Sequence, residues 1–170
     1  PTLKTGLGLA ICRGKDRAIL TYMGSINAVF PEDISDELLL SARHIHHGSF
    51  FLHTHLQPAI PDIFSRAHTM GISTSLDTNW DPAGKWNGSL NETLRLTDVL
   101  MVNEQEAACI CRTSTVDKAM EVFHDMNVRI AAIKLEEQGA RVAAGNERYS
   151  CVLPPSTCGN GIGSGDSFDA

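Results

Sequence analysis

The chain has 170 residues, of which 42% are hydrophobic and 20% are charged, and its formal net charge is −6 at pH 7. Acidic and basic residues are interspersed, which excludes the clustered Lys and Arg surface that nucleic-acid binding requires. No apolar run approaches the roughly 18 residues of a membrane-spanning helix, so we expect no contact with a membrane. The start at Pro1 and the stop at Ala170, inside a helical pattern, predict a piece cut at both ends.

Five cysteines lie at positions 12, 109, 111, 151 and 158. Their odd number and the lack of C-x-x-C spacing are not typical of a disulfide framework or a zinc site. Reduced thiols in a cytoplasmic protein are the simpler interpretation.

The first part of the chain predicts a hairpin and then a helix. The apolar runs 7–12 and 17–22 are joined by a polar turn, as in a β-hairpin. Pro31 then opens a helical stretch, at a position where proline is permitted and the acids that follow favour the helix dipole. A second strand-like run spans residues 49–52.

From residue 60 onward, helical and strand patterns alternate. Apolar residues recur at helical spacing near residues 60–70, 90–96, 104 onward and 116–123. Strand patterns lie at residues 72–76, 99–102, 130–135, 140–144 and 149–153. This alternation with short links predicts an α/β fold with a mostly parallel sheet that is covered on both faces.

Polar residues follow several of these strands at their carboxyl ends. Ligands of open α/β sheets bind beyond those ends. Asp77 and Asn79 follow one strand, and Asn103 and Glu106 follow the next. These four residues are therefore candidates for a binding site.

The strongest chemical signal is the glycine-rich segment from Asn160 to Phe168. Glycines let a backbone approach a ligand closely. If a helix begins near Gly165, its free N–H groups and its dipole favour an anion there. An acid in the first turn is stabilised as the carboxylate, so Asp166 is expected to be ionised and able to accept a proton.

Two other glycine-rich motifs do not match this segment. The spacing does not fit the dinucleotide fingerprint G-x-G-x-x-G, and no Gly-Lys-Ser/Thr follows as in a Walker A loop. A flexible linker that leads into an ordinary helix stays open, because glycine-rich loops are common.

The stretch from Gly163 to Phe168 resembles the second signature of the PfkB family, D-T-x-G-A-G-D-x-F. The resemblance implies a three-layer α/β/α, ribokinase-like fold in one incomplete domain over residues 1–170. Residues 1–29 would form lid strands and the return from them, and residues 30–170 the core. It also implies that Asp166 is the catalytic base and that Gly163, Ser164 and Gly165 form an anion hole.

The same signature extends to the residues just before the loop. Asn160 and Gly161 stand where the family commonly has Asp and Thr. The resemblance assigns this pair to the nucleotide and to a monovalent cation such as K⁺.

The segment from Asn103 to Glu106 resembles the N-x-x-E motif of the family. The resemblance places Asn103 and Glu106 at the nucleotide and gives Glu106 a role toward Mg²⁺ through water. A carboxylate just past a strand end suits the outer shell of Mg²⁺, which keeps most of its waters. A helix capping box, with Asn103 as the cap, is the structural alternative.

Substrate contacts are implied by two further segments. Asp77 to Trp86 resembles D-x-N-x-R…W, in which Asp77 and Asn79 would contact the substrate, although loop capping stays open. Arg17 and Ser25 are candidate sugar contacts on the lid side. Ser25 and its neighbours read Gly-Ser-Ile where ribokinases have Gly-Ala-Asn, which does not support a ribokinase-type contact.

Two other features lie outside these motifs. Residues 134–139 resemble the stretch K-L-G-x-x-G, with Glu136 in place of a glycine. Histidines cluster at positions 44, 46, 47, 53 and 55. Imidazole suits zinc and copper, but strand alternation sends His46 and His47 to opposite faces, which favours buried or interface histidines over a metal site.

The resemblance implies an ATP-dependent kinase that phosphorylates a sugar hydroxyl with Mg²⁺, in the cytoplasm, and is compatible with a homodimer. A kinase for a nucleoside or another small alcohol, and a sugar- or nucleotide-binding relative without catalysis, are the alternatives.

Overall fold

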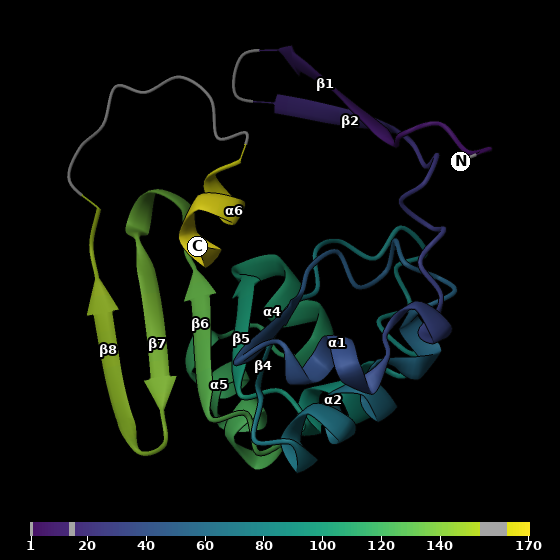
Figure 1. Cartoon of the computed structure of the whole chain (residues 1–170). Coiled ribbons are helices and arrows are strands. Elements are labelled where there is room, and N and C mark those ends of the chain that lie inside the picture. The colour runs from purple at the N-terminus through teal and green to yellow at the C-terminus, as the bar shows by residue number, and fades with distance from the viewer. Residues whose placement is uncertain (1, 14–15, 154–162) are drawn as a thin grey trace.

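The computed structural model describes residues 2–13, 16–153 and 163–170 (Figure 1). Its main sheet has six strands in the order β3-β4-β5-β6-β7-β8. Neighbours from β3 to β6 are parallel, and β7 and β8 continue the sheet as an antiparallel hairpin. The expected mostly parallel sheet is therefore confirmed. The strands are β3 (His44–His47), β4 (Ser73–Asp77), β5 (Val99–Asn103), β6 (Ile130–Lys134), β7 (Ala140–Ala144) and β8 (Glu147–Cys151).

The helices begin and end close to the positions that the apolar spacing predicts. They are α1 (Asp36–Leu40), α2 (Ile60–Thr69), α3 (Leu90–Arg95), α4 (Glu104–Cys111), α5 (Val116–Asp125) and α6 (Ser164–Asp169). Three short 3₁₀ helices are η1 (Pro31–Asp33), η2 (Gln57–Ala59) and η3 (Glu136–Gln138). The helical stretch expected from Pro31 is thus split into η1 and α1, because Ser35 caps the second helix by accepting from Leu38 N.

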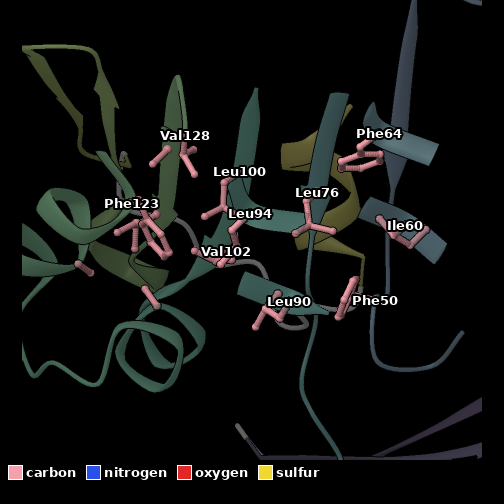
Figure 2. Packing of buried hydrophobic residues seen from close by; sticks show 14 of the residues in the cluster. Phe50, Ile60, Phe64, Leu76, Leu90, Leu94, Leu100, Val102, Phe123 and Val128 are labelled. Atoms are coloured by element: carbon pink, nitrogen blue, oxygen red, sulfur yellow. The ribbon is translucent and has the colours of Figure 1, made fainter. Parts of the chain in front are cut away.

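The hydrophobic core lies between the sheet and helices α2 to α5. Leu76 lies opposite Leu100 in the register, and Ile133 lies opposite Val102, two residues after Leu100. Leu76, Leu100 and Ile133 therefore lie on the same face of the sheet. They are fully buried against side chains of the helices, among them Phe64 and Phe123 (Figure 2). This core holds the strands whose carboxyl ends carry the polar candidates.

One strand differs from the expectation. Residues 49–52 form a turn and not a strand, and β3 instead comprises His44–His47. Ser49 has a φ of 55°, which ends the extended conformation. Phe50 is nevertheless fully buried in the core. The apolar side chains of this segment therefore pack into the core from a turn and not from a strand.

The expected hairpin is present as β1 (Leu7–Arg13) and β2 (Asp16–Tyr22), which pair in antiparallel register. It lies beyond the carboxyl ends of the parallel strands, toward the same end of the molecule as α6 (Figure 1). Several of its large apolar side chains are exposed, including Leu7, Ile19 and Leu20.

The turn between β6 and β7 depends on two residues with positive φ. Gly139 has a φ of 92°, and a Cβ there would lie 1.9 Å from the carbonyl oxygen of Cys151, so only glycine fits. Glu136, which replaces a glycine of the resembling motif, has a φ of 50°. The left-handed conformation that glycine readily adopts is thus kept here by a glutamate.

His47 is buried on the core face of the sheet, and we expect it to make the folded state less stable in acid. Burial, and then the charges of His53 and His46, lower the pKa of His47 from 6.5 to about 4. Between these two pKa values the imidazole is protonated in the unfolded chain and neutral in the folded chain. The free energy of unfolding therefore decreases as pH falls below about 6.5. We expect this residue alone to cost about 2 kcal/mol between pH 6.5 and pH 5.

Urea denaturation at these two pH values measures the effect. His47→Leu should flatten the pH dependence of the unfolding free energy by about 2 kcal/mol. His55→Leu, at an exposed histidine stacked on Phe30, is the matched control. This variant should show the same pH dependence of the unfolding free energy as the wild type. An unchanged slope in His47→Leu would contradict the assignment.

Candidate active site

Three polar side chains from neighbouring strands meet at the carboxyl ends of the parallel strands. Asp77 ends β4, Asn103 ends β5 and Lys134 ends β6, and Asn103 lies opposite Lys134 in the register. Each follows a buried run, because the strands pass through the core and reach solvent at this edge. Asp77 and Asn103, two of the candidates selected from the sequence, therefore lie at this edge, and their role in a binding site stays a prediction.

Lys134 is the centre of this group. Its Nζ lies 3.1 Å from Oδ2 of Asp77 and 3.2 Å from Oδ1 of Asp169, the last residue of α6. The side chains of Lys134, Asp77 and Asp169 are 17%, 15% and 8% exposed. The pair with Asp169 connects α6 to the sheet across 35 residues of sequence, and the pair with Asp77 joins β6 to β4 across 57 residues.

The two carboxylates of the group have opposite pKa shifts. Burial, and then a hydrogen bond with Asp77, raise the pKa of Asp169 to about 7. Burial acts in the same sense on Asp77, but the bond with Asp169, the charge of Lys134 and the backbone N–H of Asn79 together hold the pKa of Asp77 below its ordinary value. One carboxyl of the pair thus keeps a proton close to neutral pH, while the other is the ionised partner of Lys134.

Glu106 is a buried carboxyl beside this group. Asn103 and Glu106 form a capping box at the start of α4: the Asn103 side chain accepts from Glu106 N at 2.8 Å, and Glu106 Oε2 accepts from Asn103 N at 2.9 Å. Burial, and also the charge of Asp77, raise the pKa of Glu106. The cap and a cation site are compatible, because the box uses one carboxylate oxygen and leaves Oε1.

Helix α6 carries the residues of the glycine-rich signature. Gly163 precedes it with a φ of 75°, and Ser167 N donates to the Gly163 carbonyl at 2.9 Å. Asp166 is exposed in the first turn of the helix. Gly165 faces Lys134, since a Cβ at that position would lie 3.6 Å from Nζ. Asp166, Gly163, Ser164 and Gly165 therefore lie at the same edge as Asp77 and Glu106.

The loop after β4 is held by local hydrogen bonds. Asp77 Oδ1 accepts from Asn79 N, and the Asn79 side chain accepts from Trp80 N and donates to Ser49. Asp81 is buried and accepts from the backbone N–H groups of residues 83, 85 and 86. Loop capping is thus present at Asp77 and Asn79, and a substrate contact by Asn79 stays a prediction.

The other predicted residues lie elsewhere or outside the description. Ser25 is exposed in the turn after β2, where its carbonyl accepts from Ala28 N. Arg17 lies in β2 opposite Cys12, and its side chain is not among those described. Asn160 and Gly161 lie outside the described residues.

The histidine cluster divides between the two faces of the sheet. His44 and His46 hydrogen-bond to Ser75, whereas His47 is buried between Phe50 and His53. Within residues 2–13, 16–153 and 163–170, no group of three or more His, Cys, Asp or Glu side chains is arranged to hold a metal ion. In the same ranges, no helix is long and apolar enough to cross a membrane.

The sheet and the group at its carboxyl edge define a ribokinase-like α/β protein. Ribokinase from Thermotoga maritima has a TM-score of 0.79 at 20% identity, over 99% of this chain and 55% of its own. A ribokinase II candidate from E. coli, solved with ATP and Mg²⁺, has a TM-score of 0.86 at 22% identity, over 99% of this chain and 56% of its own. Adenosine kinase from Sinorhizobium meliloti has a TM-score of 0.81 at 22% identity, over 96% of this chain and 52% of its own. The chain thus spans a little over half the length of these proteins.

The model of the pfkB family of carbohydrate kinases matches residues 1–170. The chain belongs to that family. No curated protein matches the sequence.

Sequence reasoning missed Lys134 and Asp169 as members of the site. Lys134 opens the stretch that resembles K-L-G-x-x-G, and it is also a charged residue at the end of an otherwise apolar strand, which is the signal that selects Asp77 and Asn103. Asp169 lies one helical turn after Asp166 and has no local signal of its own.

Proposed function

We propose that the protein transfers the γ-phosphate of ATP to a hydroxyl group of a sugar. The observation that carries this proposal is the attachment of α6 to the carboxyl ends of β4 and β6. The attachment brings Asp166 to the edge that holds Asp77 and Glu106. Ligands of parallel α/β sheets bind at this edge.

Asp166 is the proposed general base. Its exposed carboxylate accepts the proton of the acceptor hydroxyl as that oxygen attacks phosphorus. The backbone N–H groups of Gly163, Ser164 and Gly165 stabilise the charge on the transferred group. Phosphoryl transfer depends mainly on such positioning and electrostatics.

Glu106 and Asn103 are proposed to face the nucleotide. Glu106 is a buried carboxyl near the like charge of Asp77, and a divalent cation would reduce the repulsion between them. Glu106 would hold Mg²⁺ through water, and Mg²⁺ when bound offsets the charge of the ATP phosphates. Asn160 and Gly161 are proposed for the nucleotide and a monovalent cation.

Asp77, Asn79, Arg17 and Ser25 are the proposed contacts of the acceptor. Asp77 ends β4 and Asn79 lies on the loop that follows it, whereas Arg17 and Ser25 lie on the hairpin and its return. A cytoplasmic location and a homodimer belong to the same proposal.

A nucleoside acceptor is the second candidate. The likeness to adenosine kinase from Sinorhizobium meliloti, with a TM-score of 0.81, favours it beside the likeness to ribokinases. Such folds host several acceptors, so the acceptor must be argued from the site and not from the fold.

The test is ADP formation by the full-length protein with ATP, Mg²⁺ and a panel of sugars, nucleosides and small alcohols. We expect turnover with a sugar. Turnover with a nucleoside alone would favour the second candidate. Binding of a sugar or ATP by calorimetry without ADP formation would identify a non-catalytic relative and overturn the proposal.

A further inference from the structure

Helix α6 is attached to the sheet through one cation. Lys134 Nζ lies between carboxylate oxygens of Asp77 and Asp169 at 3.1 and 3.2 Å, and each of the three side chains is less than one-fifth exposed. The contact therefore lies in partly desolvated surroundings, where paired charges are screened less than at the surface. It differs in this from the exposed ion pair between Arg141 and Asp117.

Lys134 also faces the rest of the helix. Its ammonium lies 5.8 Å from the centre of the Phe168 ring, within the range of a cation–π contact. Gly165 lies beside the ammonium group, since a Cβ built at Gly165 would be 3.6 Å from Lys134 Nζ. Gly165, Phe168 and Asp169 thus all contact or closely face this one side chain, and they flank Asp166 in the sequence.

Without the cation, the carboxyl groups of Asp77 and Asp169 would face each other directly. They already share a hydrogen bond. The loss of Lys134 removes the charged partner of both carboxyl groups, so at this point α6 keeps only the hydrogen bond between Asp169 and Asp77. No other sequence-distant ion pair to α6 is present among the described residues.

We propose that Lys134 is a positioning residue, which holds α6 on the carboxyl ends of β4 and β6 and thereby places Asp166 for proton transfer. This inference rests on the proposed function of Asp166. Lys134 acts through Asp169 and Asp77 and does not touch the reacting atoms.

The experiment uses the full-length protein and the variant Lys134→Met, which keeps the length of the side chain and removes the charge. We expect kcat to fall by about 10²-fold, since small displacements of a catalytic group have costs of this order. KM for ATP and for the acceptor should change little. Lys118→Met, at an exposed lysine of α5, is the matched control and should leave kcat unchanged.

Hydrogen exchange measured by mass spectrometry gives a second readout. The peptide that contains α6 should exchange faster in Lys134→Met than in the wild type or in Lys118→Met. The peptide that contains β5 should not change, which shows that the sheet remains folded. Unchanged exchange of α6 in Lys134→Met would overturn the proposal, even if kinase activity is present.

Asp169→Asn removes the ion pair between Lys134 and α6 and keeps the ion pair between Lys134 and Asp77. This variant replaces Lys134→Met in the experiment if Lys134→Met does not fold. Combining the two changes should lower kcat no further than the more impaired single variant, because both remove one interaction. A fall in kcat of the double variant equal to the product of the two single falls would overturn the proposal. If the wild type phosphorylates no acceptor, the proposed function fails, and the exchange of α6 still decides the role of Lys134.

Discussion

Replacing Asp166 with Asn in the full-length protein is expected to lower kcat by about 10²–10⁴-fold, with little change in KM. The amide has nearly the shape of the carboxylate but cannot take the proton of the acceptor hydroxyl. Asp166 is exposed in the first turn of α6, so the change removes no core contact and the fold should stay intact.

Initial rates of ADP formation at several concentrations of acceptor and of ATP measure this split between kcat and KM. Asp125→Asn, at an exposed aspartate that ends α5, removes the same charge far from the proposed chemistry and should behave as the wild type. Full turnover by Asp166→Asn would remove Asp166 from the role of base.

The regular part of the fold could be predicted because its strands and helices are specified by local patterns. Strands β4, β5 and β6 have buried centres and read as short apolar or small-residue runs. Helices α2 and α5 repeat their apolar residues at the helical period. Short links between such elements leave few arrangements besides a parallel sheet.

Strand β3 could not be predicted in the same way. Its sequence, His44–His47, carries three histidines and has no apolar run. It is an edge strand, and its polar side chains are satisfied across the sheet, where His44 bonds to Ser73 and Ser75. These partners lie about thirty residues away in the sequence, so a local pattern does not reveal them.

Candidate residues could be selected from the sequence to the extent that they follow strand ends. That rule selected Asp77, Asn79, Asn103 and Glu106, of which Asp77, Asn103 and Glu106 lie near one another at one edge. The link through Lys134 depends on ion pairs that join β4, β6 and α6. Such pairing is a property of the packed chain, and no spacing within a single element encodes it.

Phe123→Ala is expected to lower the free energy of unfolding by about 3–5 kcal/mol, because it leaves a cavity in a close-packed core. Phe123 is fully buried in α5, and the cluster around it includes Met120, Val128 and Ile133. Phe30→Ala is the matched control. That ring is 44% exposed and stacks on His55, so its loss should cost about 1 kcal/mol or less.

Urea denaturation followed by circular dichroism measures both losses, and the kinetics give an independent comparison. The core that contains Phe123 supports β5 and β6 from one face of the sheet, whereas the proposed chemistry lies at their carboxyl ends. Phe123→Ala should therefore lower stability while kcat per folded molecule stays unchanged, and Asp166→Asn should do the reverse. A fall in kcat of folded Phe123→Ala would mean that packing of α5 also fixes the geometry of the site.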